Sequence, residues 1–346
     1  SFMKKRSSSK AGGTPTDSPT RGESFTVEDM LTHSTAPMPT SLLKLSSDSI
    51  AKSVKMSPAV LRLINDDAIP AAELAATLQK LVKETTKRGE LRDELFLMVL
   101  RTTRCNDVPA SAQRAWELLH LTAAVLAPSR DFLGFVSEYI NECAHAEQNP
   151  PGVRSTAMKA LGALKRCAKA GPRRHPPMAE EIEALRADRK LSTIVFFLDE
   201  TFEELPYDCM TTVGEAVETL SSIIRLQQFQ TFSLFESRKQ LLLKSSAAAK
   251  EDAAAEESVI LQDGTLISDV LQDFRVAKAE KKEAVQMRLV FKKRMFRDTD
   301  ENITEPMFIN LSYLQAKHDY LGGNYPVGKE DAVQLAAFQI QAEEGP

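Results

Sequence analysis

A long stretch of helix-forming sequence carries basic side chains without acidic ones. The segment between Glu147 and Glu180 contains no Asp or Glu. Its cations are Arg154, Lys159, Lys165, Arg166, Lys169, Arg173 and Arg174. Nearby carboxylates ordinarily neutralise a solvated helix face, so we interpret their absence as a sign of an anionic partner. The chemistry expected of these residues is electrostatic binding, which is fast and is weakened by salt.

Two smaller groups of basic residues point to the same kind of chemistry. The first has helical spacing and consists of Lys80, Lys83, Lys87 and Arg88. The second follows an alternating apolar segment and consists of Lys292, Lys293, Arg294 and Arg297. An acidic phosphoinositide membrane is a candidate partner for this second group. We expect no nucleic acid partner, because no aromatic side chains interleave the long basic segment and no nucleic-acid-binding motif is present.

Residues that could support catalysis do not form a recognisable site. The five histidines are scattered, and Cys143 and His145 lie two positions apart on a predicted helix, where side chains diverge. Residues 323–330 approach a phosphate-binding loop, but Glu330 replaces the Ser or Thr that would hold magnesium. A group of acids has the pattern of turn residues between two strands: Asp199, Glu200, Glu203 and Glu204. The sequence therefore predicts a non-catalytic protein without a metal site or cofactor.

The charge of the chain is unevenly distributed. Its 346 residues carry 44 Lys and Arg against 48 Asp and Glu, yet residues 1–190 are basic and residues 191–346 are strongly acidic. This asymmetry suggests two modules that face different partners. Residues 1–24 are rich in Lys, Ser, Gly, Thr and Pro, a composition that predicts a disordered tail. Four widely separated cysteines, no signal peptide and no long apolar run favour a cytoplasmic location.

Residues 25–190 have the periodicity of a helical bundle. Apolar side chains recur at spacings of three and four over residues 91–100, 111–126, 131–145 and 153–170. Asp131 is a candidate N-cap, and Phe132, Phe135 and Val136 are expected on one buried face. Trp116, the only tryptophan, lies on such a face and is expected in the core.

The pattern changes at residue 191. Strands are expected at 193–198, 202–208, 231–236, 259–261 and 285–291, with helices at 212–224 and 266–274 and a loose insertion at 244–258. This order is that of a ubiquitin-like β-grasp lobe over 191–298. Residues 299–346 carry two further helices, at 307–321 and 331–341, too few for a domain. The fold class is therefore mainly α, a helical bundle followed by a β-grasp lobe and the first helices of a truncated helical lobe.

Several segments resemble a known tandem of domains. RGELRDELF (88–96), RAWELLHL (114–121), APSRDFLGFVSEYI (127–140) and ALKRCAKAGPRRH (163–175) resemble a myosin-tail-homology-four domain. IVFFLDETFEELPYD (194–208), TFSLFES (231–237), LVFKKRMFRD (289–298) and NYPVGKEDAVQLAAFQ (324–339) resemble the start of a FERM domain. The tandem is found in tails of unconventional myosins and in the kinesin-like calmodulin-binding family of plants and algae, which IEALRADRKLSTIVFFLDETFEE (182–204) resembles most.

The resemblance implies a tail module of a microtubule motor. We expect 25–190 to be the myosin-tail-homology-four bundle, 191–298 the first FERM lobe and 299–346 the start of the second. The implied partners are microtubules, bound electrostatically by the basic residues named above, with actin as another acidic polymer, and protein cargo docked by a complete FERM domain. An adaptor for acidic phosphoinositide membranes and a myosin-tail cargo adaptor remain as alternatives. The motor and the calmodulin-binding helix are not expected within this chain.

Overall fold

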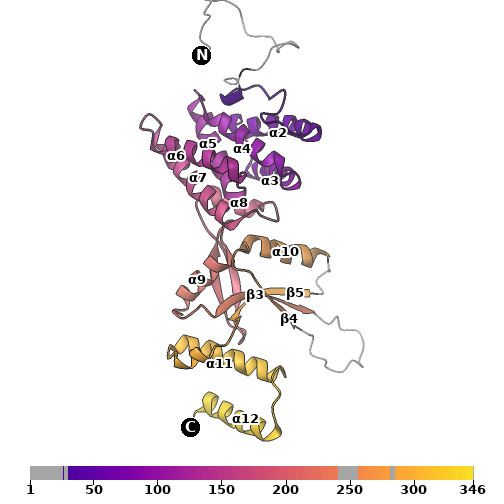
Figure 1. Cartoon of the computed structure of the whole chain (residues 1–346), viewed down its shortest axis with the longest axis vertical. Coiled ribbons are helices and arrows are strands. Elements are labelled where there is room, and N and C mark those ends of the chain that lie inside the picture. The colour runs from indigo at the N-terminus through magenta and orange to yellow at the C-terminus, as the bar shows by residue number, and fades with distance from the viewer. Residues whose placement is uncertain (1–25, 27–29, 241–255, 281–284, 346) are drawn as a thin grey trace, which may run out of the picture.

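The computed structural model describes residues 26, 30–240, 256–280 and 285–345. The predicted tail at 1–24 and most of the insertion at 244–258 lie outside the described residues. A helical bundle comes first, a sheet lobe follows, and a pair of helices lies at the far end of the lobe (Figure 1). This arrangement confirms the predicted fold class. None of the helices in the described ranges is long and apolar enough to cross a bilayer.

The bundle is built from amphipathic helices that share one core. They are α2 (Ser47–Asn65), α3 (Ala71–Lys87), α4 (Glu90–Thr103), α5 (Pro109–Val125), α6 (Arg130–His145), α7 (Pro151–Ala170) and α8 (Ala179–Arg186). Each of the five helices α3 to α7 places an aliphatic side chain at full burial, namely Leu78, Leu95, Leu119, Ile140 and Leu164. Trp116 is buried as expected and stacks on Tyr139, with ring centroids 6.1 Å apart.

Two details of helix α6 differ from the sequence prediction. The helix begins at Arg130 after Ser129, so Asp131 is inside the first turn and is not the N-cap. Phe135 was expected in the core beside Phe132, but its side chain is 70% exposed. Val136 supplies the buried contact at this turn instead. The apolar stripe of α6 is therefore wider than the surface that the bundle covers.

The lobe holds a five-stranded sheet. Its strands are β1 (Leu191–Phe196), β2 (Phe202–Tyr207), β3 (Phe232–Gln240), β4 (Glu256–Ile260) and β5 (Val285–Lys293), in the spatial order β2-β1-β5-β3-β4. The β1 and β5 strands are parallel and the other neighbours antiparallel, with Phe196 opposite Phe202 and Phe235 opposite Val290. The helices α9 (Val213–Ile223) and α10 (Ile267–Glu280) complete the predicted β-grasp pattern.

The lobe has a core of its own. Inward-facing residues of the strands, such as Val195, Leu205, Leu234 and Leu289, pack against Leu220 of α9. A short 3-10 helix, η1 (Asp298–Asn302), then leads to α11 (Pro306–Leu321) and α12 (Lys329–Glu344). Helix α11 packs on the lobe through Phe308 and Leu311, whereas α12 has no buried residue.

The bundle and the lobe are packed against each other. Cys209 and Met210, which follow strand β2, belong to the core of the bundle. The thiol of Cys209 donates to the carbonyl of Ala124 on α5 at 3.8 Å. Charged residues of the loop after α7 also reach helix α10, as described below. The basic residues near the end of α7 therefore lie beside the lobe.

Candidate anion-binding surface

The basic face of helix α7 divides into paired and unpaired cations. Its apolar side, with Ala157, Leu161 and Leu164, is buried in the bundle, which turns the long basic side chains outward. Lys165 and Lys169 are exposed, and neither has an ion pair within the described residues. These two lysines lie one helical turn apart and form a small free cationic site.

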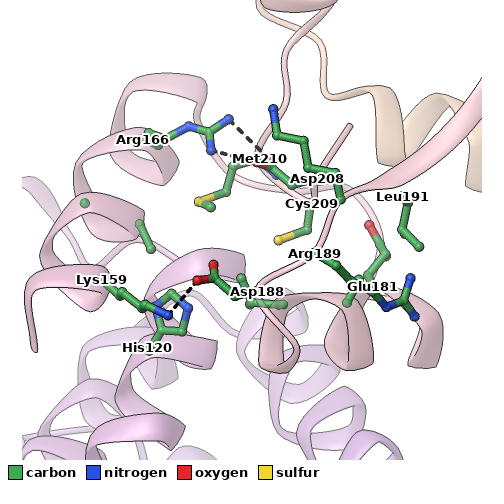
Figure 2. Close-up of a pocket in the computed structure, with 15 residues that line it drawn as sticks. His120, Lys159, Arg166, Glu181, Asp188, Arg189, Leu191, Asp208, Cys209 and Met210 are labelled. Atoms are coloured by element: carbon green, nitrogen blue, oxygen red, sulfur yellow. Dashed lines mark hydrogen bonds and ion pairs between the residues drawn. The ribbon is translucent and has the colours of Figure 1, made fainter. Parts of the chain in front are cut away.

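Lys159 and Arg166 are neutralised in a pocket of about 320 Å³ where α7 meets the lobe. The ammonium of Lys159 lies 2.8 Å from Asp188, and the guanidinium of Arg166 lies 2.7 Å from Asp208 (Figure 2). Burial raises the pKa of Asp208, but hydrogen bonds from Arg166 and from the Met210 amide outweigh burial and lower the pKa overall. Asp188 lies 29 residues after Lys159 and Asp208 lies 42 residues after Arg166, which is why the sequence segment alone appeared uncompensated.

Arg173 is buried, so the prediction that it contacts an external partner is wrong. Its side chain is 2% exposed and donates two hydrogen bonds of 3.1 Å to Glu181. Its Nε lies 3.6 Å from Asp269 on α10. Arg174 is exposed but lies 2.7 Å from Asp273 of the same helix. The acidic lobe therefore supplies much of the charge that balances this end of the basic segment.

The cations of helix α3 face solvent in a groove that we call the lysine groove. It encloses about 600 Å³, and its cationic residues are Lys80, Lys83, Lys87 and Arg174. Pro176, Pro177 and Gln272 form part of its wall. The three lysines are exposed and have no ion pair within the described part of the chain. No acidic side chain is found among the described residues that line this groove.

The two remaining members of the predicted set are less available. Arg88 is half-buried and lies 3.6 Å from Asp48 and 3.8 Å from Glu84. Arg154 is partly buried, and its Nε has no hydrogen-bond partner within the described residues. The structure thus brings Lys80, Lys83 and Lys87 together and separates them from the paired cations of α7.

The predicted membrane-binding group is also divided. Lys293 is 1% exposed, lies 2.7 Å from Asp300 and stands over the ring of Phe308, so its prediction as a membrane contact is wrong. Arg294 and Arg297 remain at the surface, although they approach Asp263 and Asp300. Lys292 lies over the ring of Phe235. The exposed pair Met295 and Phe296 was not predicted, although the sequence carries a signal for it, two apolar residues between two arginines.

The residues considered for catalysis have structural contacts. The imidazole Nδ1 of His145 lies 2.8 Å from the Asn141 carbonyl. Asp199 accepts hydrogen bonds from Thr201 in the β1–β2 turn, and Glu200 pairs with Arg288. Lys329 and Glu330 open helix α12. In the described ranges, no three His, Cys, Asp or Glu side chains gather where they could hold a metal ion.

Comparisons with known families agree with this architecture. A MyTH4 domain model matches residues 78–184, an RA like domain model matches 189–295, and a FERM central domain model matches 298–346. The MyTH4-FERM MF1 domain of Dictyostelium discoideum myosin VII has a TM-score of 0.71 at 20% identity, covering 92% of this chain and 63% of that one. The C-terminal MyTH4-FERM domain of human myosin 7b, solved with the harmonin-a PDZ3 domain, has a TM-score of 0.56 at 22% identity, covering 90% and 61%.

Curated relatives share more sequence. Kinesin-like protein KIN-14I of Oryza sativa subsp. japonica is 49% identical over 327 residues, which is 93% of this chain and 26% of the relative. Kinesin-like protein KIN-14E of Arabidopsis thaliana is 47% identical over 325 residues, again 26% of its length. The chain thus spans about a quarter of the length of these relatives. The chain carries a MyTH4 domain followed by FERM-like domains, and over this span it is similar to the plant KIN-14 kinesin-like proteins.

Proposed function

We propose that this chain is a non-catalytic adaptor segment of a kinesin-like motor and that it binds the acidic surface of microtubules through the lysine groove. The observation that carries the proposal is the set of three exposed, unpaired lysines on α3 in a groove without acidic lining. Lys165 and Lys169 on α7 add a second cationic site. We place the protein in the cytoplasm, on the cytoskeleton.

The spacing of the lysines suits an extended acidic peptide. Residues three and four apart on a helix are about 4.5 and 6 Å apart along its axis, so Lys80, Lys83 and Lys87 form a ladder roughly 10 Å long. Alternate side chains of an extended chain repeat about every 6.7 Å on one face. Two carboxylates of an acidic tail can therefore meet the ladder at once. Actin is a second acidic polymer that the same surface could bind.

Docking of protein cargo is proposed for the FERM part. The human myosin 7b structure that resembles this chain was solved with a PDZ domain. By analogy, the complete FERM domain of the longer protein would dock cargo while the MyTH4 domain holds the filament. Such a division of labour would let the motor cross-link or slide filaments.

The test is microtubule co-sedimentation of the chain across a salt series. The variant Lys80→Glu/Lys83→Glu/Lys87→Glu should bind at least tenfold more weakly, because attraction becomes repulsion at the proposed contact. Affinity of the natural chain should fall steadily as salt rises. The matched control Lys190→Glu/Lys278→Glu/Lys329→Glu makes the same change of net charge at other exposed lysines and should have a much smaller effect.

Two results would contradict the proposal. One is the absence of co-sedimentation by the natural chain at low salt. The other is an equal loss of binding in both triple variants, which would reduce the effect to net charge. Circular dichroism of each variant verifies that the helices persist.

Membrane binding is a second candidate function because Met295 and Phe296 are each about half exposed beside Arg294 and Arg297. Apolar tips between cations are the pattern by which peripheral proteins insert at an anionic bilayer surface. Flotation with phosphoinositide-containing vesicles tests it. Binding that is lost in Met295→Ser/Phe296→Ser supports the membrane function, and binding that is unchanged in that variant refutes this loop as the anchor.

A further inference from the structure

The helical bundle has an apolar groove between α4 and α6, apart from its cationic surfaces. We call it the apolar groove. It encloses about 420 Å³, and its apolar and aromatic lining comes from α4, α6 and the segment before α2: Met30, Leu31, Leu42, Leu97, Leu100, Phe132, Phe135, Val136 and Tyr139. Arg101 and Arg104 complete the lining. The apolar groove shares no residue with the lysine groove.

One wall of this groove is an aromatic stripe on α6. Phe132, Phe135 and Tyr139 lie three and four positions apart, so their side chains share one face of the helix. Phe132 and Tyr139 are partly buried against the bundle, whereas Phe135 is 70% exposed. Most of the apolar surface of Phe135 is still in contact with water. A partner that covers this ring would therefore gain most of the free energy of burying a phenylalanine.

The charge of the groove is one-sided. None of the described residues that line it is acidic. The guanidinium of Arg104 is exposed at the end of α4 and has no ion pair among the described residues. A complementary ligand therefore presents a carboxylate next to bulky apolar side chains.

The structure of the groove walls determines which backbone conformation is favourable for a bound peptide. Among the described residues the walls are α4, α6 and the segment before α2, in which Met30 and Leu31 are helical, and none of these parts is a strand. An extended peptide in this groove would leave backbone N–H and C=O groups unpaired against apolar side chains, whereas a helix pairs them internally. Helices bind such grooves through apolar residues at positions i, i+3 or i+4, and i+7.

We propose that the apolar groove is a docking site for an acidic amphipathic helix of a partner protein. Two bulky apolar side chains of that helix cover Phe132 and Phe135, and one of its carboxylates pairs with Arg104. The hollow has the size expected for such anchors. This binding is separate from filament attachment, so the two can occur together.

The probe is a fluorescein-labelled helical peptide with Leu on one face and Glu on the other, and its twin has Lys in place of Glu. Anisotropy with the whole chain should give the Glu peptide a Kd on the order of 10–100 µM, the range of a short helix in a preformed groove. The Lys twin should bind more weakly. Phe135→Gln should weaken the Glu peptide about tenfold or more, because the main apolar cover is lost.

Charge reversal gives the most specific readout. Arg104→Glu should weaken the Glu peptide and strengthen the Lys twin, reversing the preference of the natural chain. The matched control is Phe338→Gln on α12, which removes another exposed phenylalanine (65%) and should leave both affinities unchanged. Both groove positions are exposed, so neither substitution should disturb the fold or microtubule co-sedimentation.

Three results would overturn the proposal. They are no binding of the Glu peptide up to millimolar concentration, equal affinity for the two peptides, and affinities that Phe135→Gln and Arg104→Glu leave unchanged. Binding of the chain to anionic vesicles that depends on Phe135, without peptide binding, would also overturn it and would assign the groove to lipid.

Discussion

Arg173 shows how a surface charge pattern becomes an internal contact. Burial by itself lowers the pKa of this guanidinium, but Glu181 and Asp269 stabilise its charged form and raise the pKa overall. Glu181 comes from α8 and Asp269 from α10, so the charge ties the bundle to the lobe. A buried pair adds little net stability compared with apolar residues, yet breaking it leaves an uncompensated charge.

Loss of Glu181 should therefore be costly. We expect Glu181→Gln to lower the free energy of unfolding by about 3–5 kcal/mol, since Arg173 would keep its charge in a buried site with only Asp269 beside it. Glu180→Gln is the control. Glu180 is exposed and pairs with the exposed Arg275 at 3.2 Å, so its loss should cost less than about 1 kcal/mol. Urea unfolding followed by circular dichroism measures both, and equal costs would refute the role of the buried pair.

His120 should make stability depend on pH. Burial and the charge of Lys159 lower its pKa below the ordinary 6.5. The unfolded chain therefore binds the proton of His120 more tightly than the folded chain does. The contribution of neutral His120 to the free energy of unfolding is fully present above pH 6.5, and it is lost as the pH falls from 6.5 through the lower pKa of the folded chain. We expect His120→Asn to reduce the loss of stability that sets in as the pH falls below 6.5. His33, whose pKa burial and Arg101 also lower, contributes in the same direction. Urea unfolding of His120→Asn and His120→Asn/His33→Asn at several pH values separates the two.

The site could be predicted from sequence only in part, and the reason is visible in single residues. Helical spacing correctly grouped Lys80, Lys83 and Lys87, because the contacts that define them are local. The absence of acids near Arg174 in the sequence did not reveal Asp269, which lies 95 positions later and accepts a hydrogen bond from the Arg174 amide. Counting acids inside a segment measures the electrostatics of an isolated helix. It says nothing of carboxylates that the fold brings from another domain.

At the level of single elements, the sequence correctly predicted helix boundaries that residues of the same helix terminus stabilise. Thr212 accepts a hydrogen bond from the Glu215 amide, and Glu215 accepts one from the Thr212 amide. This reciprocal capping starts α9 at the position that the sequence indicated. Helix α7 likewise ends at Gly171, whose φ of 90° favours a residue without a side chain.

The cap gives a direct prediction. Thr212→Ala should destabilise the protein by about 1 kcal/mol, because an amide of the first turn of α9 loses its partner. Thr219→Ala serves as control, since Thr219 only donates to the carbonyl of Glu215 within the helix and should cost well under half as much. Hydrogen exchange of the first turn of α9 should accelerate in Thr212→Ala alone. Unchanged exchange there would contradict the capping role.

Single elements also show which features a local sequence pattern cannot predict. The alternation at 285–291 predicted strand β5, but the parallel pairing of Val195 with Leu289 depends on contacts that no local window contains. Periodicity placed Phe135 in the core because it cannot measure how far neighbouring helices reach. The residue that was misplaced, Phe135, lines the apolar groove.

For the whole molecule, the division into a basic and an acidic half has a different meaning from the one first inferred. The halves face each other, with Arg166 on Asp208 and Arg174 on Asp273. The bundle nevertheless retains free cations at α3 and at Lys165 and Lys169. Ion pairs at the interface therefore neutralise some of the positive charges of the bundle and leave the others available to an outside partner.

The interface should consequently tune binding at the lysine groove. Asp273 of the lobe holds Arg174, which lines that groove together with the α3 lysines. We expect Asp273→Asn to strengthen co-sedimentation with microtubules about two- to fivefold at low salt, because it releases Arg174 and removes a repelling carboxylate. The gain should disappear at high salt. Asp188→Asn is the matched control, since it makes the same change of charge beside Lys159, which does not line the groove. An equal gain in both variants would show that binding follows net charge and not the groove. A gain confined to Asp273→Asn would show that docking of the lobe on the bundle sets the strength with which the chain binds its filament.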